Sequence, residues 1–150
     1  MKALSLKLWL YLWCNVFLLV LCHYFGIFDL LLRYDFTFIS FGIIGIMMLD
    51  MIYLTISVWK GQTIDLENHW AVKDLLLAMG LTGTLIGLIY VFTPLGGVDT
   101  SDLAAMKGLV VHVAVGVGTK LWTSLAGIIC SNILMIFLLM IQSYQQELRN

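Results

Sequence analysis

The sequence has few charged residues, one proline and three cysteines. Charged side chains make up 11% of the 150 residues, and the formal net charge is −1. There is no run of basic residues, so the chain lacks the electrostatic signature of a nucleic-acid-binding protein and we exclude that class. Cys14, Cys22 and Cys130 all lie in apolar stretches without metal-ligand spacing, and we expect them to be small buried residues.

Apolar residues dominate the rest of the chain. They account for 61% of it, and the mean hydropathy is +0.99, which is typical of an integral membrane protein. A helix needs roughly 20 apolar residues to cross a bilayer. Residues 1–150 are therefore predicted to form a single all-α membrane domain, a polytopic protein whose transmembrane helices cover about 8–32, 36–59, 75–93 and 103–142.

The orientation of these helices is predicted from their flanking charges. Lys60 to Asp74 is expected to be a connecting loop with room for one helical turn. With four spans, one side of the membrane carries Lys2, Lys7, Lys60, Lys73 and Arg149, against Arg33 and Lys107 on the other. The positive-inside rule then predicts that both termini and this loop are cytoplasmic.

A glycine-rich segment marks the third predicted helix. At about 100° per residue, Gly80, Gly83, Thr84 and Gly87 lie on one side of it. Small residues of this kind let two transmembrane helices pack closely. Thr84 is therefore expected in a packed helix contact or a pore wall, and not against lipid.

The last predicted helix has a similar face. Its members are small or polar and lie within about 120° of one another: His112, Gly116, Lys120, Thr123, Ser124, Gly127, Cys130 and Ser131. Unsatisfied polar groups are costly in lipid, so this face is expected to contact other helices, with Gly116 and Gly127 as packing positions.

Asp50 lies well inside the second predicted helix. An ionisable group at that depth costs several kcal/mol unless it is paired, protonated or in contact with water. Two interpretations stay open: a functional intramembrane acid, or an aspartate that fixes helix packing through hydrogen bonds. In the loop, Asp65, Glu67 and His69 are interpreted as solvated side chains, and no metal site or cofactor is expected.

The third and fourth helices together resemble the MotA/TolQ/ExbB family of ion-channel subunits. The family has a G-L-x-G-T-x-x-G helix, similar to Gly80–Gly87, and a later A-L-x-T-T-x-x-G-L segment, similar to Leu121–Ile128. The resemblance covers roughly Leu75 to Ile141. It implies a multi-pass subunit of a bacterial-type inner membrane, a homopentameric ring, and two copies of a single-span MotB-, TolR- or ExbD-like partner that carries an essential aspartate.

The resemblance also implies roles for particular residues. Thr84, Thr123 and Ser124 match pore-lining positions of the family, and the implied activity is passage of protons or sodium ions, coupled to movement of the partner. Two features depart from the family: the large cytoplasmic region is missing, and Lys120 is a cation where small residues are usual. Lys120 could repel cations, extend to the membrane interface, or pair with Asp50 or a partner carboxylate; we favour the second.

Two other functions remain as alternatives. One is a small proton-coupled transporter that uses Asp50 as its own carboxylate, and the other is a membrane scaffold subunit whose glycines only pack. No enzymatic function is predicted, because His23, His69 and His112 have no serine or cysteine partner at a recognisable spacing.

Overall fold

A computed structural model describes residues 2–29, 38–62, 64–93 and 103–147. These residues form four long helices and no strand: α1 (Lys2–Tyr24), α3 (Ile39–Trp59), α4 (Leu66–Phe92) and α5 (Leu103–Glu147). Each contains a stretch that is long and apolar enough to cross a membrane. The all-α fold with four candidate spans is confirmed, while the side on which each terminus lies stays a prediction.

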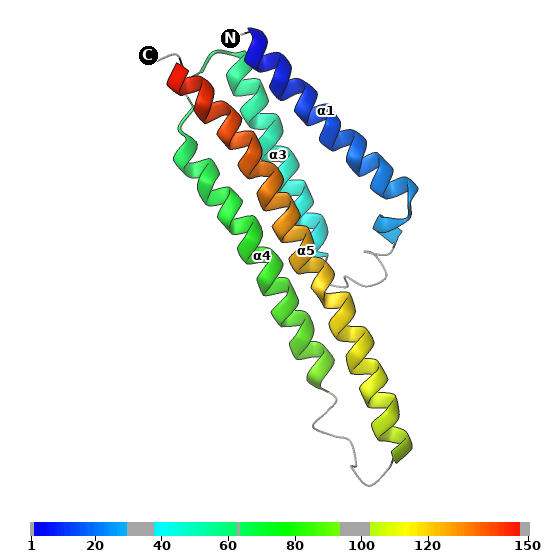
Figure 1. The fold of residues 1–150 in the computed structure, drawn as a ribbon. Helices are drawn as coiled ribbons and strands as arrows, with labels where there is room; N and C mark the ends of the chain where they lie inside the picture. Colours follow the sequence, from blue (N-terminus) through cyan, green and yellow to red (C-terminus); the bar gives the residue numbers. More distant parts are fainter. Residues whose placement is uncertain (1, 30–37, 63, 94–102, 148–150) are drawn as a thin grey trace.

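The helices form an elongated bundle in which α4 and α5 run side by side and extend past α1 and α3 (Figure 1). The first turn of α1 and the last turn of α5 lie at the same end of the bundle. With 45 residues, α5 is about 67 Å long at about 1.5 Å per residue, whereas the hydrocarbon core of a bilayer is about 30 Å thick. Part of α5 must therefore tilt or project from the lipid, as its long apolar sequence suggested.

The first helix ends earlier than predicted. Instead of continuing to residue 32, α1 stops at Tyr24, and Gly26 adopts φ 71° while its backbone N–H donates to the carbonyl of His23 at 3.0 Å. A left-handed glycine is a common helix stop. Hydropathy alone could not place this end, because apolar residues continue on both sides of Gly26. The predicted span over residues 30–32 and the start at residue 36 lie outside the described residues.

The third helix begins earlier than predicted, so the loop assigned to Lys60–Asp74 was wrong over most of its length. α4 starts at Leu66, directly after Asp65, whose carboxylate accepts a hydrogen bond from the backbone N–H of Glu67 at 3.1 Å. Asp65 thus caps the helix, and the charge of Glu67 in the first turn favours the positive end of the helix dipole. The early start places His69 on a helix.

The buried core lies where α1, α3, α4 and α5 meet. Its fully buried members include Ile43 and Met51 of α3, Leu76 of α4 and Phe137 of α5. Many large apolar side chains are exposed on the outside of all four helices, as expected of a surface that faces lipid. The expectation that all cysteines are buried was wrong: Cys130 is buried, Cys22 is half-buried and Cys14 is exposed.

Candidate functional site

The glycine-rich segment of α4 packs directly on α5 of the same chain. Gly80 and Gly127 meet at the closest point, where a Cβ atom added to Gly80 would lie 2.9 Å from the Cα of Gly127 and 3.1 Å from the carbonyl oxygen of Thr123. Carbon atoms in ordinary contact are about 3.5–4.0 Å apart. The two backbones therefore touch, and both positions require glycine. We call the contact between residues 80–91 of α4 and 116–127 of α5 the α4–α5 seam.

The other glycines of the two motifs make room for side chains across the seam. A Cβ atom at Gly83 would lie 2.6 Å from the methyl group of Thr123, and one at Gly116 would lie 2.6 Å from a methyl group of Val91. A Cβ atom at Gly87 would overlap the aliphatic part of Lys120. All the positions predicted as packing glycines, Gly80, Gly83, Gly87, Gly116 and Gly127, thus lie in this seam.

Two hydroxyl groups meet inside the seam. The Oγ1 atom of Thr84 lies 2.7 Å from the Oγ atom of Ser124, so one hydroxyl donates to the other. Thr84 is also within donor distance, 3.1 Å, of the carbonyl oxygens of Gly80 and Lys120, and Ser124 lies 3.4 Å from that of Gly80. The cluster joins one helix to the other by polar groups in an otherwise apolar environment.

The three predicted pore hydroxyls differ in how far they are covered. Thr123 and Thr84 are buried, with exposed fractions of 1% and 7%, whereas Ser124 is half-buried. Thr123 uses its methyl group to fill the space above Gly83. The structure therefore brings Thr84 and Ser124 together, with Ser124 at the open edge of the seam, and gives Thr123 a packing contact.

Lys120 is buried in the seam, with 6% of its surface exposed. Its stem crosses α4 over Gly87, whose missing side chain leaves space for it. Lys120 lies within α5, in a candidate membrane span of that helix. The fit between Gly87 and Lys120 joins two residues that the sequence did not connect, and the extension of the ammonium group to an interface stays a prediction.

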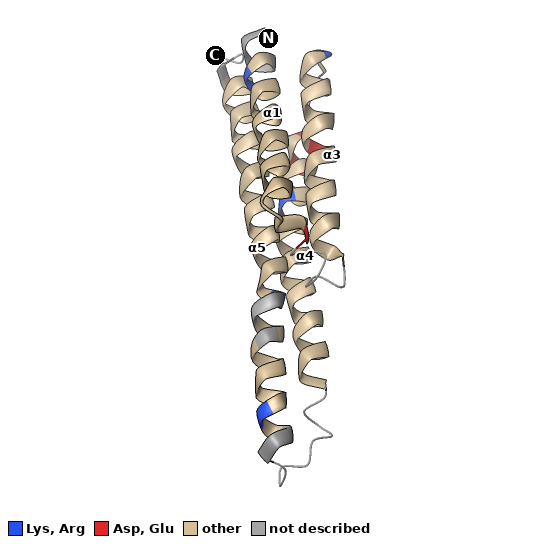
Figure 2. Ribbon diagram, turned by 90° about the vertical axis from the view of Figure 1, so that its right-hand side faces the viewer, with Lys and Arg blue, Asp and Glu red and all other residues tan. Residues whose placement is uncertain are grey.

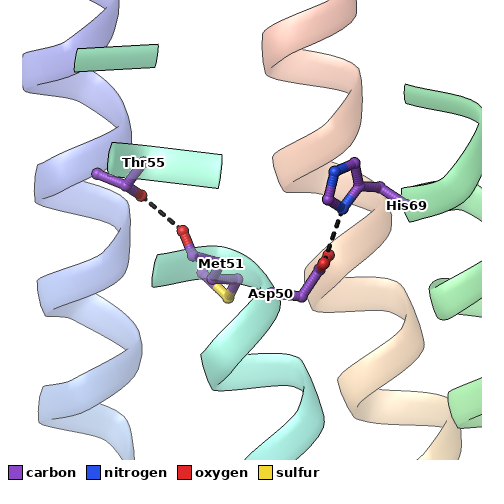
Figure 3. A network of polar contacts seen from close by, with 4 residues as sticks. All are labelled: Asp50, Met51, Thr55 and His69. Carbon is purple, nitrogen blue, oxygen red and sulfur yellow. Dashed lines mark hydrogen bonds and ion pairs between the residues drawn. The ribbon is translucent and has the colours of Figure 1, made fainter. Parts of the chain in front are cut away.

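Asp50, the predicted intramembrane acid, has a partner that the sequence did not indicate. Asp50 of α3 and His69 of α4 point toward each other, and His69 Nδ1 lies 2.7 Å from Asp50 Oδ1 (Figure 3). Both side chains are almost covered, with exposed fractions of 11% and 12%. Asp50 thus pairs with His69, and the solvated loop position expected for His69 was wrong.

The surroundings of this pair are partly polar. The ring of His69 stacks on that of Tyr53, with 5.7 Å between their centroids. His69 and Tyr53 also line a cavity of about 230 Å³, together with Ser57, Gln62, Ile64, Asp65 and Asn68. Asp50 Oδ2 is buried and has no hydrogen-bond partner among the described residues.

Charged groups elsewhere are sparse. Figure 2 shows the positions of charged residues scattered along the ribbon of the described helices. The described residues contain no group of three or more histidine, cysteine, aspartate or glutamate side chains that could hold a metal ion. Asp65 and Glu67 do not join His69 in such a group.

Searches with this chain found no matching protein-family model, no matching curated protein and no matching solved structure.

One sequence signal could have found the Asp50 partner. On a helix, position 69 lies at nearly the same angle as position 80, since eleven residues correspond to about three full turns. If the third helix had been extended back to the Asp65 cap, His69 would have shared the inward face of Leu76, Gly80 and Thr84. His69 was missed as the partner because the start of the third helix was predicted too late in the sequence.

Proposed function

We propose that the chain is the ring-forming subunit of an ion channel in a bacterial-type inner membrane, similar to MotA, TolQ and ExbB. Five copies surround two single-span partner helices, whose carboxylate carries protons or sodium ions past the hydroxyls of the seam. The flow of ions moves the partner relative to the ring and so performs mechanical work.

One observation carries this proposal: the fold brings the hydroxyls of the two resembling motifs into contact. Thr84 and Ser124 are 40 residues apart in sequence, yet their oxygens are 2.7 Å apart. A hydroxyl can donate and accept at once, so the pair can bind a carboxylate or water at Ser124 and stay connected to Thr84. Because Ser124 is at the open edge of the seam, it is the group that a neighbouring helix can reach.

The ring depends on the resemblance more than on the small faces of the helices. Those faces cover one another within one chain, at Gly80 against Gly127, and do not by themselves require another subunit. The apolar side chains that remain exposed on both helices, such as Leu85 and Ile89 of α4 and Leu121 of α5, can contact either lipid or a neighbouring copy.

Native mass spectrometry of the purified chain tests the ring. We expect one defined oligomer with the mass of five chains, in several mild detergents. A mass of one chain in every detergent would contradict the ring and favour the scaffold or the transporter.

A second candidate is favoured by a specific contact. The buried pair of Asp50 and His69 is what a small proton-coupled transporter with its own carboxylate needs. Proton flux into liposomes that contain the chain alone separates the two candidates. A transporter shows flux that Asp50→Asn abolishes, whereas a channel subunit shows flux only with its partner and tolerates Asp50→Asn.

A further inference from the structure

We propose that Asp50 and His69 form a proton-binding site that exchanges its proton with water through the polar cavity beside His69. The site lies between α3 and the first turns of α4, away from the hydroxyls of the seam. His69 precedes Gly80 by eleven residues on α4, about 16 Å along the helix axis. The inference stands whether or not the chain forms a ring.

The first argument is the charge balance of the pair. With a neutral imidazole and an ionised carboxylate, the largely covered pair has a net negative charge, which is costly in a membrane protein interior. One added proton makes the pair neutral overall. The bare Oδ2 of Asp50 strengthens the preference, because a buried carboxylate oxygen without a donor loses its hydration without replacement.

The second argument is the route to water. His69 contributes to the wall of a cavity of about 230 Å³, far more than the roughly 10–15 Å³ that one water molecule needs. Ser57, Gln62 and Asn68 line the same cavity and offer hydrogen bonds to water. The Nδ1 atom of His69 is engaged with Asp50, so Nε2 is the nitrogen that can exchange a proton with the cavity.

The third argument is the chemistry of the groups around the pair. Histidine is the side chain that ordinarily gains and loses charge near neutral pH. Tyr53 stacks on the imidazole, and Asp65 is among the residues that line the cavity. Lys73, one turn further along α4, is engaged with Asp74 at 2.8 Å.

Other elements packed on α3 and α4 add little charge. Between residues 121 and 146, α5 has no aspartate, glutamate, lysine, arginine or histidine, and its titratable groups are Cys130 and Tyr144. α1, which contacts α3 and α5, has the exposed Lys7, His23 and Tyr24, together with Lys2, Tyr11 and two cysteines. His69 and Asp50 therefore interact electrostatically mainly with each other and with Asp65.

Nitrogen-15 NMR of the full chain in lipid bilayers tests the site. With labelled histidine, the His69 signals, assigned by their loss in His69→Gln, should change from the neutral to the doubly protonated form between pH 8.5 and 5. In Asp50→Asn the doubly protonated signal of His69 should be weaker than in the wild type, because the counter-charge is gone.

Matched variants make the result specific. Glu67→Gln removes an exposed acid two residues from His69 and should leave the transition in place, and Asp50→Glu should restore most of it. Infrared difference spectra between the same pH values provide a second measurement. The Asp50 carboxylate bands of the wild type should be altered in His69→Gln. An identical His69 transition in Asp50→Asn, or no His69 change over this pH range, would overturn the proposal. Neither measurement needs a partner or a ring, so their failure would leave the channel proposal intact.

Discussion

Replacing Gly80 by alanine is expected to destabilise the bundle, because the added methyl group would meet backbone and not a movable side chain. Its Cβ would lie 2.9 Å from the Cα of Gly127 and 3.1 Å from the carbonyl oxygen of Thr123. To restore ordinary carbon contacts, α4 and α5 must separate by roughly 1 Å at this point. The hydrogen bond between Thr84 and Ser124, now 2.7 Å, would lengthen with them.

The magnitude follows from three contributions. Overpacking of a tight contact costs about 1–3 kcal/mol, and a weakened hydrogen bond between membrane helices costs about 0.6 kcal/mol. Alanine in place of glycine gains up to about 1 kcal/mol in helix propensity. The matched control is Gly45→Ala on α3, where an added Cβ meets nothing within 4 Å and only the propensity gain remains.

Reversible unfolding in mixed detergent micelles, followed by circular dichroism, measures the difference. We expect Gly80→Ala to be about 1.6–3.6 kcal/mol less stable than Gly45→Ala, the sum of the overpacking and hydrogen-bond costs. Equal unfolding free energies for the two variants would refute the close approach of Gly80 and Gly127.

Two further predictions concern the same bundle. Gly87→Ala should lower the unfolding free energy less than Gly80→Ala, because its methyl group meets the flexible stem of Lys120. Lys120→Ala should rescue the stability of Gly87→Ala but not that of Gly80→Ala. Unfolding of the single and double variants checks this, and an absent rescue would contradict the contact between Gly87 and Lys120. A membrane-permeant maleimide should label the exposed Cys14 at least about tenfold faster than the buried Cys130, since local opening limits reaction in a core. Mass spectrometry of single-cysteine variants measures both rates, and equal rates would argue against the way α1 packs.

The number of long apolar helices was predictable from the sequence, but the helix ends were not. Twenty apolar residues in a row leave few options in a bilayer, so four apolar stretches became four helices. Hydropathy does not reveal a helix end at a residue such as Gly26, whose neighbours are apolar. It also does not reveal a helix start within a polar segment such as Leu66–Asp74. Those ends depend on glycine conformation and on a side-chain cap, which are local geometry.

Helical periodicity gave the faces of α4 and α5, and it gave Thr84 and Ser124 as candidate residues. It could not show that the two faces cover each other within one chain, because a face that avoids lipid can meet any helix. Pairs such as Gly87 with Lys120, or Asp50 with His69, depend on the register between helices, which tertiary packing decides. Only one part of these pairs could be predicted from the sequence. Recognising Asp65 as a helix cap would have placed His69 on the inward face of the third helix.

The central claim is that the hydroxyl contact of the α4–α5 seam lies on the ion path. The most direct measurement is ion flux in liposomes that contain the chain with the proposed single-span partner. The double variant Thr84→Val and Ser124→Ala keeps the shape of the seam but removes both hydroxyls. The control Thr82→Val removes an exposed hydroxyl two residues away on α4.

The account predicts that the double variant loses flux by about tenfold or more, since a hydrogen bond to a charged group is worth about 1.5–3 kcal/mol. Its oligomer yield should stay close to that of the wild type, and Thr82→Val should keep both flux and yield. Unchanged flux in the double variant would contradict the claim and leave the seam as a packing contact only.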